Sequence, residues 1–190
     1  MANLAIVGGF AAGKTTLSEG LVQQGWTRVS FARLLKEMAA RAYGGEIQKN
    51  ETYFVRDLES GATRGISGRR VLQELGQSVK GMDRDFWISS LLSDIRNGVY
   101  GNGPYVIDDC RFPYEAEALR AQGFVIVALD TPLDTRIRRY YATYGYYPTS
   151  AELVHPSEIE LVDIVVDHAI DGEMTPKEIL EAAYKIGMEA

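Results

Sequence analysis

The sequence is poor in the residues that form disulfide and zinc sites. It holds one cysteine, Cys110, and two histidines, His155 and His168, which lie far from it and from each other. A single cysteine cannot form a disulfide within the chain, which is typical of proteins from reducing compartments. Because Cys110 lies in an apolar segment, we expect a small buried residue rather than a reactive thiol. No Cys/His/carboxylate group has metal-ligand spacing, so a structural zinc site is not expected.

Long apolar runs are also absent. No stretch approaches the roughly 20 residues of a membrane span, and the first residues lack the charged start and cleavage site of a signal peptide. We therefore expect a cytoplasmic protein without a membrane partner. The 190 residues suit one domain with a full core, and 46% hydrophobic with 24% charged residues are typical of a globular protein.

Positive charge is scarce and unevenly placed. The formal net charge of −6 argues against a broad nucleic-acid-binding surface. Every arginine lies at or before Arg139, and only Lys177 and Lys185 are cationic in residues 151–190. An acidic protein with arginines concentrated in its middle fits a small polyanionic ligand held in a cleft.

What the sequence does hold is a complete phosphate-binding loop at residues 8–16. It matches G-x-x-x-x-G-K-T, follows the apolar run 4–7 and precedes a helical pattern. Backbone amides and the helix N-terminus can hold phosphate oxygens, Lys14 adds a mobile cation, and Thr15 can bind the Mg²⁺ that accompanies ATP or GTP. The expected nucleotide-binding residues are Gly8, Gly9, Phe10, Ala11, Ala12, Gly13, Lys14, Thr15 and Thr16.

Apolar runs of strand length alternate with longer segments of helical period. This pattern predicts an α/β fold, a doubly wound, mainly parallel five-stranded sheet with helices on both faces, in one domain without linkers or repeats. Strands are expected at 3–7, 26–30, 105–109, 124–129 and 165–170. Helices are expected at 13–24, 32–43, 69–80, 85–97, 113–121, 131–141 and 175–188, with a short one starting near 157. Residues 44–68 lack clear periodicity, so we expect a long, partly ordered loop, either a functional flap or a surface insertion.

Ligands of open parallel sheets gather at the carboxyl ends of the strands, which singles out residues 108–111 after the third strand. Asp108 or Asp109 can hold Mg²⁺ directly or through water, and Arg111 can pair with a transferring phosphate. Two carboxylates after an apolar run also suit a helix cap. Beside the phosphate loop, they are candidates for the second half of a magnesium–nucleotide site, and which of them serves the metal stays open.

Further arginines lie on expected helices. Arg136 and Arg139 share a helix face at i and i+3, whereas Arg138 points elsewhere. They form either a solvated helix face or a set of lid cations that close over bound phosphates, and the glycines and tyrosines that follow favour the lid. Of Arg69 and Arg70, one is expected to face outward while the other could reach an acceptor phosphate.

Four stretches carry a resemblance to a known family. These are Ser-Phe-Ala-Arg-Leu-Leu-Lys-Glu at 30–37, Arg-Val-Leu-Gln-Glu-Leu-Gly at 70–76, Ile-Asp-Asp-Cys-Arg-Phe-Pro-Tyr-Glu-Ala-Glu at 107–117 and His-Pro-Ser-Glu at 155–158. With the phosphate loop, they make the chain resemble, from end to end, the P-loop nucleoside monophosphate kinases, most closely the deoxynucleoside monophosphate kinases of bacteriophages. The third and fourth stretches are the more specific ones, since the loop alone identifies only the superfamily.

The resemblance implies Mg²⁺-dependent transfer of the γ-phosphoryl group of ATP to a deoxynucleoside monophosphate, in the host cytoplasm if the chain is phage-encoded. It also implies a monophosphate-binding region at 31–97 and a lid at 132–156, and it leaves a homodimer open. The implied catalytic residues are Lys14, Asp109, Arg111, Arg136 and Arg139. The implied metal residues are Thr15, Asp108 and Asp109, and the implied substrate residues are Phe31, Arg33, Lys36, Arg70, Gln73 and Arg111.

The chain departs from the family pattern at Arg33, where the family often has a pair more like Asp-Pro, and at Gln77-Ser78, where a Thr is common. The chemistry of the acceptor gives a separate reason to expect a monophosphate. A monophosphate is largely dianionic at neutral pH because its second pKa is about 6, so its oxygen needs positioning and charge neutralisation but no general base. Many arginines without an obvious base favour this acceptor, although Asp108 or Asp109 could serve as a base for a hydroxyl acceptor.

Two alternatives remain. Another small P-loop kinase, of the dephospho-coenzyme A or shikimate type, would share the donor loop and differ in its acceptor. A nucleotide-gated switch is less favoured, because neither an Asn-Lys-x-Asp guanine motif nor an Asp-x-x-Gly switch motif occurs in the sequence. Neither the accepted bases nor a preference for deoxyribose over ribose can be read from the residues.

Overall fold

A computed structural model describes residues 1–56 and 59–190, apart from the side chains of 151, 152 and 157. By its internal contacts the chain divides into two compact units, Met1–Ser30 with Gly98–Ala190, and Phe31–Asn97. The second unit spans the residues for which the resemblance implies monophosphate binding, and that role stays a prediction. Within the described residues, no helix is both long and apolar enough to cross a membrane.

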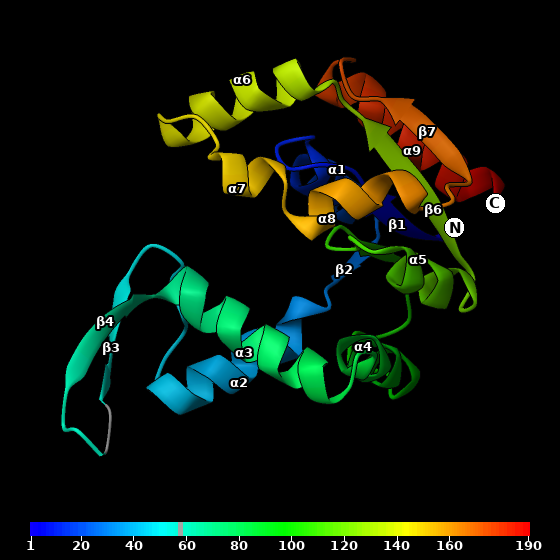
Figure 1. Ribbon diagram of the computed structural model, residues 1–190. Coiled ribbons are helices and arrows are strands. Elements are labelled where there is room, and N and C mark those ends of the chain that lie inside the picture. Colours follow the sequence, from blue (N-terminus) through cyan, green and yellow to red (C-terminus); the bar gives the residue numbers. More distant parts are fainter. Residues whose placement is uncertain (57–58) are drawn as a thin grey trace. The chain divides into compact units, whose positions relative to one another are not determined.

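The first unit is built on a parallel five-stranded sheet, as expected (Figure 1). Its order is β2-β5-β1-β6-β7, with every neighbouring pair parallel. The strands are β1 (Asn3–Val7), β2 (Thr27–Val29), β5 (Tyr105–Ile107), β6 (Phe124–Asp130) and β7 (His168–Asp171). The three central strands are almost fully buried, which is why their sequences are continuous apolar runs rather than alternating ones.

Helices cover both faces of this sheet. They are α1 (Lys14–Gln23), α5 (Pro113–Arg120), α6 (Leu133–Tyr144), α7 (Ser150–Leu153), α8 (Pro156–Ile159), the 3₁₀ helix η1 (Glu160–Asp163) and α9 (Pro176–Glu189). Leu17 and Leu21 of α1 and Ile179 of α9 share one buried cluster with alternate residues of β1 and β6, such as Leu4 and Ile6. Successive strand residues face opposite sides, so the intervening buried residues pack on the other face.

The second unit holds α2 (Ala32–Tyr43), α3 (Gly68–Met82) and α4 (Phe86–Arg96), with the strands β3 (Thr52–Arg56) and β4 (Thr63–Ser67). One buried cluster of this unit consists of Ala39, Ile47 and Leu72, against which Leu35, Tyr53 and Leu75 pack. The side chain of Ser67 caps α3 by accepting a hydrogen bond from the Arg70 amide, 3.3 Å away.

The expectation of a long loop at residues 44–68 is wrong, because β3 and β4 pair as an antiparallel ribbon within it. The register runs from Thr52 opposite Ser67 to Arg56 opposite Thr63. Residues of β3 alternate between exposed and half-buried, and Phe54 is 74% exposed. The residues Thr, Tyr, Phe, Val and Arg of β3 favour a strand. Because both strands are only weakly buried, however, their sequences lack a clear alternation of apolar and polar residues. Residues 57 and 58 of the expected loop lie outside the described residues.

The last strand begins later than expected, at His168 rather than at 165. The Asp167 carboxylate Oδ2 accepts a hydrogen bond from the Ile126 amide of β6, 2.8 Å away, so regular pairing starts only after this residue. Val165 is 71% exposed, because it precedes the paired segment. The strands expected at 26–30 and 105–109 are likewise shorter, at Thr27–Val29 and Tyr105–Ile107.

Candidate active site

The phosphate loop connects β1 to α1, at the carboxyl edge of the sheet, in the setting that the sequence predicts. Its backbone requires glycine at two positions. Gly13 has φ +105°, which L side chains rarely adopt, and at Gly8 an added Cβ would lie 2.8 Å from the Leu129 carbonyl oxygen of β6. The loop is therefore held close to β6 at one end, and α1 begins directly after Gly13.

Lys14 is buried inside this loop and folds back on it. Its Nζ donates hydrogen bonds to the carbonyl oxygens of Gly8 and Gly9, at 2.6 and 2.7 Å. Burial, followed by the nearby charge of Arg111, lowers the pKa of Lys14 to about 8, and Arg136 adds to the effect. Three cations therefore act in one small region and could hold a ligand with several negative charges, although the carboxylates of Glu158 and Asp108 also act on Lys14 and raise its pKa.

A carboxylate already lies on the loop. Glu158 of α8 accepts hydrogen bonds from the Phe10 amide on both carboxylate oxygens, each at 3.1 Å, and pairs with Nη1 of Arg136 at 3.0 Å. The side chains of Arg136 and Glu158 are only 18% and 9% exposed. The Arg136 guanidinium also lies 4.9 Å from the centre of the Phe10 ring. The loop amide and Arg136 thus form a site that binds an anionic oxygen.

The arginines of α6 divide as the sequence predicts. Arg136 and Arg139 both reach the phosphate loop, whereas Arg138 pairs with Asp134, 3.5 Å away on the same helix. Arg139 donates to the carbonyl oxygens of Ala12, at 3.1 Å, and Gly172, at 2.8 Å. In this structure Arg139 therefore joins α6 to the loop and to the turn after β7, and Arg136 pairs with the carboxylate that lies on the loop.

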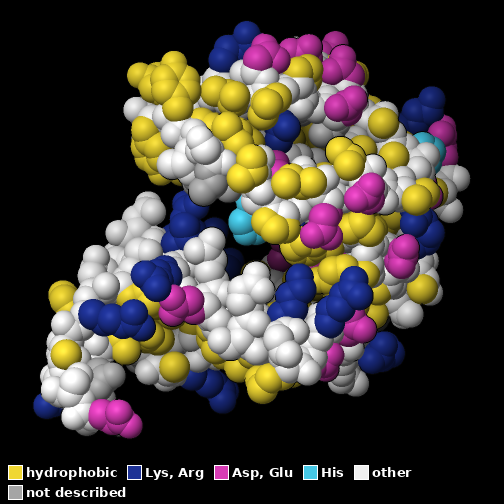
Figure 2. Space-filling view, in the orientation of Figure 1, with side chains coloured by type: hydrophobic (Ala, Val, Ile, Leu, Met, Phe, Trp, Pro, Cys, Tyr) yellow, Lys and Arg dark blue, Asp and Glu magenta, His cyan; other side chains and the backbone are white. Residues whose placement is uncertain are grey.

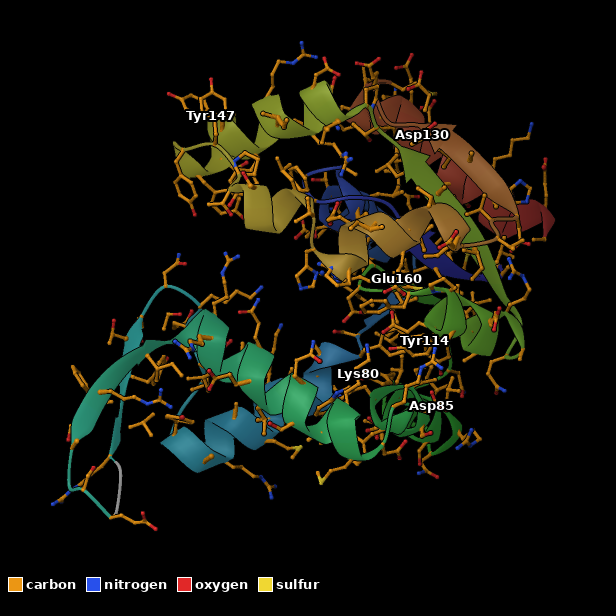
Figure 3. All side chains as sticks on the ribbon, in the orientation of Figure 1. Lys80, Asp85, Tyr114, Asp130, Tyr147 and Glu160 are labelled. Carbon is orange, nitrogen blue, oxygen red and sulfur yellow. The ribbon has the colours of Figure 1, made fainter. Side chains whose placement is uncertain are left out.

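Aromatic side chains continue this contact along α6. Tyr140 packs edge-on against Phe10, with ring centroids 5.7 Å apart. Tyr144 and Tyr146 pack in turn against Tyr140, and Tyr147 stacks on Tyr141. Tyr147 is labelled beside α6 in Figure 3, and Figure 2 shows a hydrophobic group over the same region. The segment expected as a lid is thus tied to the phosphate loop by rings as well as by Arg136.

Asp108 and Asp109 have different environments at the end of β5. Asp108 is buried, and its two oxygens accept from Nε and Nη2 of Arg28, at 3.2 and 2.7 Å. Its Oδ2 also accepts from the Ser18 hydroxyl, at 2.9 Å. Asp109 is half-buried, and its Oδ2 accepts from the Ser30 hydroxyl at 2.7 Å. The Asp108 carboxylate is therefore committed to an ion pair, which the sequence did not reveal because Arg28 lies 80 residues away.

Cys110 and Arg111 follow directly. Cys110 is fully buried, as expected, and burial raises the pKa of its thiol, with the charges of Glu115 and Asp109 adding to the effect. The Glu115 carboxylate Oε2 accepts from the backbone amides of Arg111 and Phe112, at 2.7 and 3.2 Å, and so fixes the turn into α5. Arg111 itself is exposed, and its charge acts on Lys14.

The second unit carries the other expected substrate residues. Phe31 is 8% exposed, and the Arg33 guanidinium pairs with Glu37 on α2 and with Asp94 on α4. Arg70 is largely exposed and pairs through Nε with Glu74, 2.6 Å away. Gln73 is exposed one turn further along α3, on the face that Arg70 shares.

A cavity of about 490 Å³ lies in this unit, between Lys36 on α2, Leu72 on α3 and the segment 46–51. The first amides of α3 do not face this space as free donors, because the amides of Gly68 and Arg69 donate to the carbonyl oxygens of Glu51 and Lys49. The cations of this cavity are therefore the side chains of Lys36 and Lys49, beside the carboxylates of Glu46 and Glu51, and the helix N-terminus does not add an anion site. Within the described part of the chain, no group of three or more His, Cys, Asp or Glu is arranged to hold a metal ion.

Comparisons with known proteins extend this description. No family model and no curated protein matches the chain. Among solved structures, a sugar kinase from Janibacter sp. HTCC2649 matches at TM-score 0.57 and 16% identity, over 100% of this chain and 95% of that one. A gluconokinase from Sinorhizobium meliloti 1021 matches at TM-score 0.56 and 13% identity, over 99% and 94%. A shikimate kinase from Aquifex aeolicus vf5 matches at TM-score 0.53 and 13% identity, over 98% and 96%.

The chain shares the α/β fold of these kinases. At these identities the likeness concerns the fold alone. Within it, the structure brings Lys14 and Arg136 to the phosphate loop, and the charge of Arg111 acts on Lys14. Sequence reasoning missed Glu158 as a member of this group, although the His-Pro-Ser-Glu stretch at 155–158 was a signal for it.

Proposed function

We propose that the protein transfers the γ-phosphoryl group of ATP to a deoxynucleoside monophosphate and so forms the diphosphate. The binding of ATP in this proposal rests on three cations that act at the phosphate loop. Arg111 and Arg136 both act on Lys14, and the Phe10 amide of the loop already binds a carboxylate oxygen of Glu158. Such a site neutralises charge spread over a transferring phosphoryl group, and phosphoryl transfer depends mainly on positioning and electrostatic stabilisation.

Magnesium belongs to the same proposal. Thr15 lies exposed at the start of α1, and Asp109 follows β5 at the carboxyl edge of the sheet, so hydroxyl and carboxylate oxygens suited to Mg²⁺ are present. We assign the metal to Thr15 and Asp109, because both oxygens of Asp108 are engaged by Arg28. When bound, the ion would neutralise part of the charge of the phosphates.

For the acceptor, the support comes from the resemblance at 30–37, 70–76 and 107–117 and from the cations of the second unit. Arg70 and Gln73 share an exposed face of α3, and Lys36 lines a cavity. We propose that Arg70 and Lys36 neutralise the monophosphate and that Gln73 contacts the nucleotide. Arg33 pairs with two carboxylates, which favours a role in joining α2 to α4.

A kinase with a hydroxyl acceptor is the second candidate, and the structural neighbours favour it, since their names specify sugar, gluconate and shikimate substrates. Such an acceptor is helped by a carboxylate that takes its proton. Asp109 would be that base, since Asp108 is held by Arg28. A monophosphate acceptor needs no such group, because its oxygen is already ionised.

A coupled ADP-release assay separates the two candidates. The purified protein is given ATP and Mg²⁺ with each of the four common deoxynucleoside monophosphates, and in parallel with shikimate, gluconate or dephospho-coenzyme A. We expect turnover with at least one deoxynucleoside monophosphate. Turnover with a hydroxyl substrate and with none of the monophosphates would replace the main proposal by the second candidate. Tight binding of GTP without turnover of any acceptor would instead favour a nucleotide-gated switch.

A further inference from the structure

The Glu158 carboxylate contacts the phosphate loop in the way that a bound anion would. Both carboxylate oxygens lie 3.1 Å from the Phe10 amide nitrogen, and one of them lies 3.0 Å from Arg136 Nη1. The charge of Glu158 also acts on Lys14, whose pKa it raises against the larger effect of burial. One side chain therefore interacts with the amide, the arginine and the lysine that a bound phosphate would need.

These interactions are incompatible with a nucleotide phosphate in the same loop. The Phe10 amide has one hydrogen to donate, and a phosphate oxygen beside the Glu158 carboxylate would place two anions together in a mostly buried site. Because like charges at short range repel strongly where water is excluded, the carboxylate and the phosphate compete for this position.

The segment that carries Glu158 consists of short helical elements. α8 has four residues and is followed directly by the short η1, so neither element is stabilised by a long helix. Three of its apolar side chains are exposed, Val154 at 63%, Ile159 at 56% and Val162 at 84%, whereas Ile164 at its end is buried. The bonds of Glu158 to the phosphate loop therefore add to limited packing, and an anion that replaces them can loosen this segment.

Arg136 also has contacts with the loop that do not involve Glu158. Its guanidinium lies over the Phe10 ring at 4.9 Å, and it is so close to Gly9 that an added Cβ there would meet Arg136 Nη1 at 1.7 Å. The Arg136 amide donates to the Pro132 carbonyl oxygen at the start of α6. A phosphate that displaces Glu158 would thus meet an arginine already in position.

We propose that Glu158 is a built-in competitor for the phosphates of the nucleotide, which holds the Phe10 amide and Arg136 in the unliganded protein and gives both up when a polyphosphate binds. This inference rests on the proposed binding of ATP to the loop. It assigns a role to the His-Pro-Ser-Glu stretch: the glutamate lowers the affinity for nucleotide, because the site is open only in the fraction of molecules that has released Glu158.

Isothermal titration tests this exchange with ADP, inorganic pyrophosphate and adenosine as probes. Glu158→Gln removes the charge, Glu158→Ala removes the contact as well, and Glu160→Gln is the matched control. Glu160 comes from the adjoining η1 and is labelled in Figure 3. We expect Glu158→Ala to bind ADP and pyrophosphate about tenfold more tightly than the wild type, Glu158→Gln to bind with intermediate affinity, and Glu160→Gln to bind like the wild type. Adenosine, which lacks phosphate, should show no gain with any variant.

Thermal unfolding distinguishes competition between Glu158 and phosphate from a purely structural role of Glu158. Both Glu158 variants should unfold at a slightly lower temperature than the wild type without ligand, and should show a larger upward shift when ADP is added. If the wild type binds ADP and the folded Glu158 variants bind it no more tightly, this inference is wrong and the proposed function is unaffected. Absence of ADP and pyrophosphate binding in the wild type and in both Glu158 variants would overturn the proposed function, and this inference with it.

Discussion

The two units hold their cations in different ways. In the first, Lys14 is buried, and Arg136 lies at the phosphate loop in a mostly buried ion pair with Glu158 of another helix. In the second, Arg33 and Arg70 are each paired with a carboxylate four residues along the same helix. The donor side thus keeps Lys14 and Arg136 mostly buried, with a carboxylate beside them, whereas the pairs of the acceptor side are more exposed.

This difference implies different sensitivity to substitution. Charges concentrated in a buried loop cannot be replaced by water, so loss of one should affect the chemical step. Exposed pairs such as Arg70 with Glu74 are worth little to stability, about 0 to 1 kcal/mol, because water screens them. Loss of Arg70 should therefore act on substrate binding and leave the fold unchanged.

Lys14→Met gives the largest expected effect. It keeps the length of the side chain and removes the cation, so kcat should fall by roughly 10³-fold through loss of transition-state stabilisation. The measurement is steady-state ADP release with saturating ATP and monophosphate. A fall of less than about tenfold in a folded variant would contradict the convergence of charge on Lys14 as the basis of the donor site.

The pH dependence of nucleotide affinity comes next. Because the pKa of Lys14 is lowered to about 8, its amine loses its proton in the unliganded protein as pH rises through 8. A bound polyphosphate favours the charged form, so binding above pH 8 requires uptake of a proton and grows weaker. ADP affinity should fall more than about tenfold between pH 7.5 and 9.5 in titration calorimetry.

Lys14→Met is the control for this pH profile. It should bind ADP more weakly at pH 7.5 and lose no further affinity up to pH 9.5. An equal decline in wild type and variant would assign the titration to another group.

Arg70→Ala tests the acceptor side. The KM for the monophosphate should rise about tenfold while the KM for ATP stays within about twofold, since one charge-assisted contact is lost on one substrate only. Steady-state kinetics with each substrate varied in turn measures both values. Arg69→Ala is the neighbouring comparison: if it raised the monophosphate KM more than Arg70→Ala, the contact would belong to Arg69.

Arg33→Ala gives the smallest kinetic effect expected. Its loss leaves Glu37 and the half-buried Asp94 without their partner, so the free energy of unfolding should fall by about 1 kcal/mol. The monophosphate KM should change less than about threefold. Chemical denaturation measures the first quantity and kinetics the second. A tenfold rise in the monophosphate KM without loss of stability would indicate that Arg33 contacts the substrate after all.

The same contrast explains what the sequence could predict. The phosphate loop and the central strands β1, β5 and β6 could be predicted, because burial on both faces produces continuous apolar runs and the loop needs glycine and lysine at fixed spacing. The antiparallel ribbon of β3 and β4 could not be predicted from the sequence. Its residues are polar or, like Phe54, exposed, so apolar and polar positions do not alternate clearly.

Long-range pairings in the site were also beyond sequence reasoning. Phe10 and Glu158 lie 148 residues apart, and Arg28 and Asp108 lie 80 residues apart. Only the folded sheet and the return of the chain after α6 bring them together. The residues of the donor site could therefore be selected by type and position, but the carboxylate that occupies the loop could not.

Identification of the product tests the central claim most directly. The protein is incubated with Mg²⁺ and ATP labelled with ¹⁸O in the γ-phosphoryl group, together with an equimolar mixture of the four common deoxynucleoside monophosphates, shikimate and gluconate. Mass spectrometry then locates the label. The account predicts labelled deoxynucleoside diphosphate and unlabelled ADP in equal amounts. Label in a sugar or shikimate phosphate, with no deoxynucleoside diphosphate formed, would contradict it.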